Sequence, residues 1–279
     1  MNMRFDGRLM ILAAAVVHFL IPAMGARGEE HTRQVIEATC KVTGANSTAT
    51  AWLVKDDEGE NGGSKRVFLV TAAHVFDMMQ GEDATLVGRE KAKEGMLGRH
   101  DVRFKIRSGG KNLWSTVANA DVAVMPFDVP EGVLLQPLSI RSLATEKQIE
   151  ERKIGVGEDL RLAGFPQQNE ANGAGLPLVR RGCISSHPFL PIASHRVFLV
   201  DYNSFAGDSG GPIFLPAPAG ANPADSAPLV LGLVSGQRFI DERTKTLFEE
   251  RLERIRLGIG IAVHADFIRQ AIQVAKEKK

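Results

Sequence analysis

Most of the chain after residue 30 consists of short apolar runs, many of them rich in β-branched residues, separated by turn-forming residues. Examples are Val67–Val70, Val122–Met125 and Val197–Val200. Runs of this length and composition favour strands over helices. Long helical patterns do not alternate with them, which argues against a doubly wound α/β sheet. The pattern predicts an all-β barrel or sandwich.

The charge balance narrows the possible partners. The chain has 279 residues, with 34 Lys and Arg against 33 Asp and Glu, so its formal net charge is +1. A nucleic-acid-binding protein of this size usually carries a broad basic surface, and this composition supplies none. We therefore expect no nucleic-acid partner. The length allows one large domain or two smaller ones with real cores.

Residues 1–25 have the pattern of a secretory signal peptide. Arg4 and Arg8 make the start basic, an apolar stretch follows at Leu9–Met24, and small residues lie where a signal peptidase cleaves. The alternative is an uncleaved membrane anchor, but the stretch is short for a span. No later run is long and apolar enough to cross a membrane. We therefore expect an exported protein, periplasmic or secreted, with no stable membrane span after cleavage.

The two cysteines, Cys40 and Cys183, are far apart in the sequence. Export would permit a disulfide, but two cysteines do not make a framework. The favoured interpretation is that both are small buried hydrophobic residues. Neither belongs to a Cys-x-x-Cys pair, so we expect no metal site. The sequence also predicts no cofactor.

Two stretches have helical patterns. Asp241–Leu257 is highly charged, and Phe248, Leu252 and Ile255 are spaced as one apolar stripe. Residues 266–279 start with a capping Asp, place apolar residues on one face and end in lysines, as a helix at the end of a domain does. Both stretches are predicted to be helices.

The strongest local motif is Gly207-Asp208-Ser209-Gly210-Gly211-Pro212. A nucleophilic serine needs an exposed hydroxyl and backbone N–H groups aimed at the developing oxyanion, and glycines leave room for both. The structural alternative is a glycine-rich turn before the apolar strand 213–215. Six residues in this order favour the catalytic interpretation.

Two further residues are weaker candidates when taken singly. His74 directly follows the apolar strand Val67–Val70, where rigid structure could hold a general base, but it could also be an ordinary surface histidine. Asp121 stands at the entrance to the apolar strand Val122–Met125, as a turn residue or as a carboxylate that orients an imidazole.

Together, the order His74, Asp121, Ser209 with a strand beside each resembles the trypsin-like (chymotrypsin-fold) serine peptidases, in particular exported bacterial-type members. Gly232–Gly236 and Gly258–Val263 resemble the two strands that line the family's specificity pocket. An α/β-hydrolase would place a helix after Ser209, whereas a strand pattern follows it here.

The resemblance implies an all-β fold of two six-stranded antiparallel β-barrels with the active site in the cleft between them. Residues 34–145 would form the first barrel, with His74 and Asp121. Residues 146–265 would form the second, with Ser209 and the specificity pocket. A C-terminal helix, residues 266–279, would follow.

The resemblance also implies a role for each site residue. His74 would be the general base, Asp121 would orient it, and the N–H groups of Gly207 and Ser209 would bind the oxyanion. The substrate-binding residues would be Asn203 at the pocket base together with Ser235 and Gly236. Asn203 is neutral, which predicts a small or medium neutral side chain at the cleavage site.

Many members of the family are activated when a freed amino terminus pairs with the Asp beside the serine. No suitable segment lies between Ala26 and Val35, so Asp208 needs another partner or none, and we expect activity without proteolytic activation. Arg89–Lys111 is predicted to be a charged surface loop. For Asp241–Leu257, a solvated helix is favoured over a lid that brings Arg251 or Arg254 to the cleft.

The predicted function is an exported serine endopeptidase that acts on proteins or peptides through an acyl-enzyme intermediate. The main alternative is a catalytically silent trypsin-like domain that binds peptides or a partner. A narrow esterase with the same acyl chemistry is a third possibility. The presence of all three residues, His74, Asp121 and Ser209, favours an active enzyme.

Overall fold

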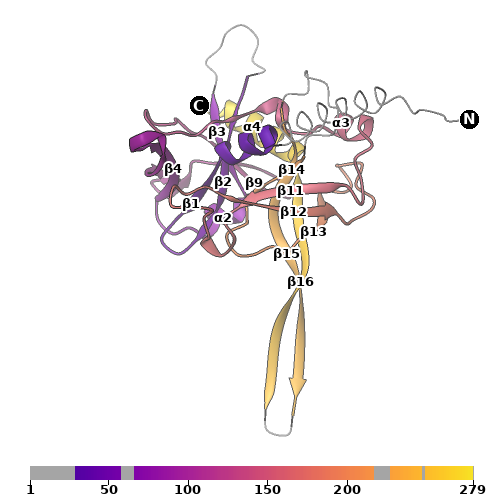
Figure 1. Ribbon diagram of the computed structural model, residues 1–279. Helices are drawn as coiled ribbons and strands as arrows, with labels where there is room; N and C mark the ends of the chain where they lie inside the picture. The colour runs from indigo at the N-terminus through magenta and orange to yellow at the C-terminus, as the bar shows by residue number, and fades with distance from the viewer. Residues whose placement is uncertain (1–28, 58–65, 217–226, 247–248, 279) are drawn as a thin grey trace, which may run out of the picture.

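The computed structural model describes residues 29–57, 66–216, 227–246 and 249–278 (Figure 1). Residues 29–38 are helical. The elements that follow in the N-terminal half are β1 (Thr39–Thr43), β2 (Thr48–Lys55), β3 (Val67–Thr71), α2 (Ala73–Met78), β4 (Asp83–Lys91), η2 (Lys93–Gly95), β5 (Leu97–Lys105), β6 (Arg107–Ser108), β7 (Lys111–Asn112), β8 (Ser115–Val117), β9 (Ala120–Pro126), β10 (Leu138–Ser139) and η3 (Ile140–Ser142).

The C-terminal half begins with a short helix and ends with a longer one. Its elements are α3 (Glu146–Glu151), β11 (Asp159–Gly164), η4 (Pro166–Gln168), β12 (Leu178–Ile184), β13 (Val197–Asp201), β14 (Pro212–Leu215), β15 (Leu229–Lys245), β16 (Glu250–His264) and α4 (Ala265–Glu277). The predicted signal peptide, residues 1–25, lies outside the described residues.

The first half is an eight-stranded sheet in the order β5-β4-β1-β2-β3-β9-β8, with β10 pairing in parallel with β2. Its central strands are apolar and buried: six of the eight residues of β2 and four of the five of β3 are fully inside. Such continuous burial explains why these runs lack a polar–apolar alternation. Six strands were predicted for this half. The sheet has eight, and the two shortest are β8, at one edge, and β10, which pairs with β2.

The second half is a closed barrel in the order β11-β12-β13-β16-β15-β14. Closure pairs every strand on both sides and leaves no free edge within the barrel. The mostly β architecture, with a closed six-stranded barrel, a second sheet and a C-terminal helix, confirms the predicted fold class.

The C-terminal helix α4 links the two halves. Its apolar face is buried against β8 and β9 of the first half and against β15 of the second. The guanidinium of Arg269 donates to the carbonyl oxygens of Leu143 at 3.0 Å and Ile140 at 2.8 Å. The end of the chain therefore packs on its first half. Among the described residues, no helix is long and apolar enough to cross a membrane.

The predicted helix at Asp241–Leu257 is wrong. The segment continues β15 and β16 beyond the barrel as an antiparallel hairpin, which projects from the body as a two-stranded ribbon (Figure 1). Asp241 pairs with Arg254 in register, and their side chains form an ion pair of 2.8 Å. Leu252 and Ile255 therefore lie on opposite faces instead of in one stripe, and the helical lid is excluded as well. Phe248 lies outside the described residues.

The predicted surface loop at Arg89–Lys111 is also wrong. Most of it is the antiparallel pair β4–β5, in register from Asp83 opposite Lys105 to Lys91 opposite Leu97. Strand β5 alternates strictly between exposed and half-buried residues, and four of its five exposed residues are charged, so the segment resembles a loop in composition. Arg89 is only 2% exposed.

His264, the last residue of β16, is completely buried in the core of the barrel. Its ring lies 4.7 Å from that of Phe189 and 4.8 Å from that of Phe198, centroid to centroid. Burial in these surroundings disfavours the charged imidazolium and lowers the pKa of His264 to about 4.

The depressed pKa predicts an acid-sensitive fold. The unfolded chain takes up a proton on this histidine near pH 6.5, whereas the folded chain resists until about pH 4, so the free energy of unfolding should fall as the pH drops through that interval. The slope for one proton is at most about 1.4 kcal/mol per pH unit. Urea unfolding at several pH values should show a shallower fall in His264→Leu. An unchanged pH dependence in that variant would contradict the assignment.

Candidate active site

His74 sits at the junction of a strand and a short helix. Strand β3 ends at Thr71, whose buried hydroxyl donates to the carbonyl oxygen of Thr50 at 2.8 Å, and the extended residue Ala72 leads into α2. This places His74 in the first turn of α2, directly after the rigid core of the sheet. A catalytic base needs such a fixed origin, because its ring has to keep one orientation through the reaction.

Asp121 holds both the backbone and the ring of His74. Its Oδ1 accepts the His74 backbone N–H at 2.9 Å, and its Oδ2 accepts from the ring Nδ1 at 2.7 Å. The hydroxyl of Ser235 donates to the same Oδ2 at 2.5 Å. Burial opposes ionisation of Asp121, but the bonds from His74 and Ser235 outweigh it and lower the pKa of this carboxyl below its ordinary value.

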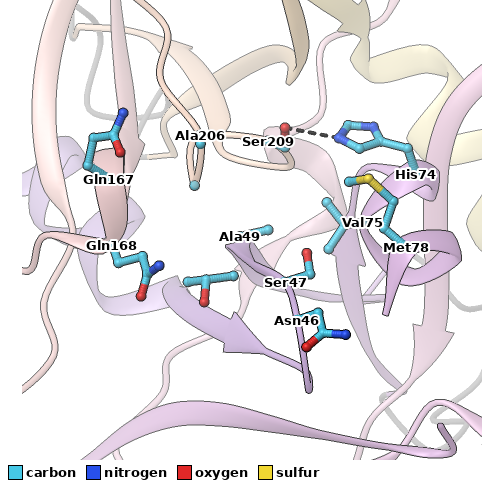
Figure 2. Close-up of a pocket in the computed structure, with 12 residues that line it drawn as sticks. Asn46, Ser47, Ala49, His74, Val75, Met78, Gln167, Gln168, Ala206 and Ser209 are labelled. Carbon is cyan, nitrogen blue, oxygen red and sulfur yellow. Dashed lines mark hydrogen bonds between the residues drawn. The ribbon is translucent and has the colours of Figure 1, made fainter. Parts of the chain in front are cut away.

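Ser209 completes a line of three side chains. Its Oγ lies 3.0 Å from His74 Nε2 (Figure 2). His74 and Asp121 come from the first half and Ser209 from the turn before β14 in the barrel. The structure thus brings together the three residues predicted from motifs far apart in the sequence.

Gly207 is a glycine for both conformational and steric reasons. Its φ is +99°, and a Cβ there would lie 2.2 Å from the carbonyl oxygen of Phe165. The carbonyl of Ala206 accepts the N–H of Gln167 at 2.7 Å. The carbonyl of Gly207 accepts the hydroxyl of Thr50, also at 2.7 Å. Within the described part of the chain, the N–H groups of Gly207 and Ser209 donate to no protein acceptor, so both remain available to a ligand.

Asp208, beside Ser209, is 1% exposed and paired from within the chain. Its Oδ1 forms an ion pair with the guanidinium of Arg180 on β12. Its Oδ2 accepts the hydroxyl of Tyr202 at 2.7 Å and the N–H of Phe205 at 2.8 Å. No motif in the sequence marks Arg180 as the partner of Asp208. The one signal in the sequence was Asp208 itself, which has no suitable activating segment between Ala26 and Val35 and was therefore expected to have another partner or none.

The predicted substrate-binding residues have different surroundings. The hydroxyl of Ser235 donates to Asp121, so it lies against the carboxylate that holds His74. Asn203 lies at the base of the hairpin: its carbonyl accepts from Arg180 at 3.0 Å, and a Cβ on Gly258 would lie 3.0 Å from its side-chain oxygen. A Cβ on Gly236 would meet nothing within 4 Å. Substrate contacts for these three residues remain predictions.

A cavity of about 330 Å³ adjoins Ser209 and His74 between the two halves. Neither Asn203, Ser235 nor Gly236 lines it. No Asp, Glu, Lys or Arg lines it; small and amide side chains form most of its walls, with the apolar Val75 and Met78 on α2 (Figure 2). The full lining is Asn46, Ser47, Thr48, Ala49, His74, Val75, Met78, Gln167, Gln168, Ala206, Gly207 and Ser209.

Both cysteines are free thiols. Cys40 is fully buried, as predicted, and burial raises the pKa of its thiol to about 12. Cys183 is only partly buried, so the prediction of two buried cysteines holds for one of them. Across the residues that the structure describes, no group of three His, Cys, Asp or Glu side chains could hold a metal ion.

Comparison with known proteins decides the family. The sequence profile of the family described as Trypsin matches residues 36–247. The chain belongs to the trypsin family of serine proteases. No curated protein sequence matches the chain.

The comparison also finds solved structures that are similar to this chain. An inactive-form serine-to-alanine mutant of Rv3671c from M. tuberculosis H37Rv has 14% identity over 88% of this chain and 89% of its own, with a TM-score of 0.46. The inactive form of the Rv3671c protease has 18% identity over 86% and 90%, with a TM-score of 0.45.

The Asp208–Arg180 pair predicts a large effect on stability. Arg180→Met removes the cation and leaves the carboxylate of Asp208 buried without a countercharge, which typically costs about 3–5 kcal/mol. Because the Arg180 side chain is 25% exposed, we expect about 3 kcal/mol, the lower end of that range.

The neighbouring Arg181 provides the control. Its side chain is 78% exposed and pairs with the exposed Asp159 at 3.0 Å, so Arg181→Met should change stability by less than about 0.5 kcal/mol. Urea unfolding of both variants beside the wild type measures the difference. Equal effects of the two substitutions would contradict a structural role for the buried pair.

Proposed function

We propose that this trypsin-family protein is an exported serine endopeptidase that cleaves peptide bonds through an acyl-enzyme intermediate. One observation carries the proposal: Asp121, His74 and Ser209 form a continuous line of hydrogen bonds, 2.7 Å and 3.0 Å long, that ends at a cavity between the two halves. The carboxylate can only accept, so Nδ1 carries the proton and Nε2 is free to take one from the serine.

In the acylation step, Ser209 Oγ attacks the carbonyl carbon of the scissile bond while its proton moves to His74 Nε2. Asp121 stabilises the imidazolium that forms. The negative charge on the former carbonyl oxygen would be bound by the N–H groups of Gly207 and Ser209. The C–N bond then breaks, and the leaving amine takes the proton from Nε2.

In deacylation, a water molecule takes the place of the amine. His74 accepts its proton, the resulting hydroxide attacks the acyl carbon, and the bond to Ser209 Oγ breaks as the proton returns to the serine. Ser235 supports both steps indirectly, because its hydrogen bond to Oδ2 helps to keep Asp121 ionised and in place.

Three features support the finer parts of the proposal. The internal ion pair of Asp208 is in keeping with activity without proteolytic activation. The neutral Asn203 favours small or medium neutral residues at the cleavage site. Export rests on residues 1–25 of the sequence, whose basic start and apolar stretch have the features of a signal peptide.

Removing the nucleophile tests the proposal directly. Ser209→Ala should abolish casein cleavage and labelling by a fluorophosphonate probe, because no other group in the line can form the acyl bond. Ser47→Ala is the control: it removes a hydroxyl from the same cavity that is not bonded to His74.

The outcomes of this test separate the candidate functions. Unchanged hydrolysis in Ser209→Ala would refute the assignment. A wild-type protein that is labelled but leaves casein intact points to an esterase. A wild-type protein that is not labelled at all points to a silent binding domain.

Asp121→Asn provides a graded test. An amide at this position can donate to Nδ1 and so favours the tautomer in which Nε2 carries the proton and cannot act as base. We expect kcat to fall on the order of 10⁴, the size of effect known for the orienting aspartate in such triads. Steady-state kinetics with a peptide ester measures it. A loss below tenfold would contradict the orienting role of Asp121.

A further inference from the structure

We propose that Glu170 is a positioning residue for the oxyanion-binding backbone, acting through the loop of residues 165–177, which we name the bridging loop. Ion pairs to Glu170 hold this loop on the first sheet, and the loop in turn fixes the orientation of the Ala206–Gly207 peptide. The inference rests on the proposed function, since it concerns the donor that would bind the oxyanion.

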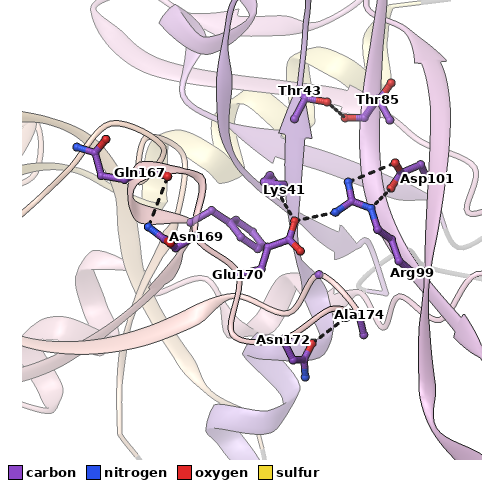
Figure 3. Close-up of polar contacts among 12 residues, drawn as sticks. Lys41, Thr43, Thr85, Arg99, Asp101, Gln167, Asn169, Glu170, Asn172 and Ala174 are labelled. Atoms are coloured by element: carbon purple, nitrogen blue, oxygen red, sulfur yellow. Dashed lines mark hydrogen bonds and ion pairs between the residues drawn. The ribbon is translucent and has the colours of Figure 1, made fainter.

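The bridging loop joins β11 to β12, two neighbouring strands of the barrel, yet its middle docks on the other half of the molecule. Glu170 Oε1 contacts Lys41 Nζ on β1 and, at 2.8 Å, Arg99 Nη1 on β5 (Figure 3). The side chains of Lys41 and Glu170 are only 11% and 16% exposed, so solvent and salt screen their attraction weakly.

A second contact strengthens this docking. A Cβ on Gly175 would lie 2.4 Å from Val87 Cγ1, so the loop backbone presses directly on β4. The carbonyl of Gly175 also accepts from the buried Arg89 at 3.3 Å. Between the two contacts, the N–H of Ala171 donates to the carbonyl of Leu176 at 2.8 Å and closes the turn. The loop is therefore held on the first sheet at two points.

The start of the same loop packs against the oxyanion-binding backbone. The N–H of Gln167 donates to the carbonyl of Ala206 at 2.7 Å, and the carbonyl of Phe165 occupies the space where Gly207 would carry a Cβ. In a trans peptide the C=O and the next N–H point in opposite directions. Holding the Ala206 carbonyl toward Gln167 therefore directs the Gly207 N–H away from the loop, as an oxyanion donor requires.

The loop needs external support to keep this geometry. Gln167 and Gln168 have φ values of +50° and +65°, a left-handed conformation that is unfavourable for residues other than glycine. Such backbone persists only where its surroundings hold it. Glu170 follows two residues later and provides the nearest ionic contact with the first sheet. If that contact is lost, the loop can relax and the Gln167–Ala206 hydrogen bond is lost with it.

Asp101, a second carboxylate beside Arg99, offers a matched control for Glu170. Asp101 also binds Arg99, at 2.8 Å, but it is half exposed and does not contact the loop. Asp101→Asn therefore removes a carboxylate from the same cluster and leaves both cations on Glu170. Glu170→Gln keeps the size of the side chain and removes the charge that attracts Lys41 and Arg99.

The experiment compares these two variants with the wild type in steady-state peptide hydrolysis and in the binding of a peptide aldehyde. The aldehyde adds to a serine nucleophile as a hemiacetal whose oxygen needs the same N–H donors. We expect Glu170→Gln to lower kcat and aldehyde affinity together by about 10- to 100-fold, less than the 10²–10³ that follows loss of a whole oxyanion donor. KM should change less than twofold, and Asp101→Asn should match the wild type.

Each outcome bears on one proposal. A Glu170→Gln protein that is less stable but retains wild-type kcat and aldehyde affinity would overturn the positioning role. If that variant does not fold, Arg99→Gln decides: normal kcat and affinity overturn the role, and a joint loss supports it. A wild type that is neither labelled by the fluorophosphonate nor inhibited by the aldehyde would instead overturn the proposed function.

Discussion

The arrangement of the site depends on one buried residue, Thr50, in the middle of β2. Its N–H donates to the Ser209 carbonyl at 3.0 Å, and its hydroxyl donates to the Gly207 carbonyl at 2.7 Å and accepts from the Phe165 N–H at 3.2 Å. Its carbonyl accepts from Thr71, at the end of the strand that carries His74. Thr50 therefore connects three segments: the turn that contains Ser209, the bridging loop, and strand β3, which leads to His74. The 3.0 Å separation of His74 from Ser209 spans two separate bodies, and these bonds set their spacing at that point.

An ion pair and a hydrogen bond to Asp208 stabilise the turn that contains Ser209. Asp208 is almost fully buried, and an isolated carboxylate there would be strongly unfavourable. The guanidinium of Arg180 and the hydroxyl of Tyr202 satisfy both of its oxygens. Burial, with the neighbouring carboxylate, raises the pKa of Tyr202, so this hydroxyl stays protonated and remains a donor. The turn that presents Ser209 is therefore held by a charge that the chain itself provides, from a strand that contributes nothing to the triad.

The triad could be predicted from the sequence because each member lies beside a strongly apolar strand and within a short motif. Thr50, Arg180 and Glu170 could not, since each acts on residues distant in sequence or on the other half and no local pattern marks such a partner. The error at Asp241–Leu257 has a different cause. A two-stranded ribbon with both faces in solvent needs no alternation of polar and apolar residues, so the period of two that marks a strand is missing. Its few apolar residues happen to have the spacing of one face of a helix, which led to the wrong prediction.

The packing of the chain end shows why a site divided between two bodies can stay aligned. Helix α4 leaves the barrel after β16 and returns to the first half, where Arg269 caps the carbonyls at the end of η3 and Lys278 donates to the Trp114 carbonyl at 2.9 Å. The bridging loop makes a second connection from barrel to sheet through Glu170. Two connections at separate places restrict rotation as well as separation of the halves. A small rotation of one half would change the His74–Ser209 distance before it exposed the core, so in the proposed mechanism these connections matter more for the reaction than for stability.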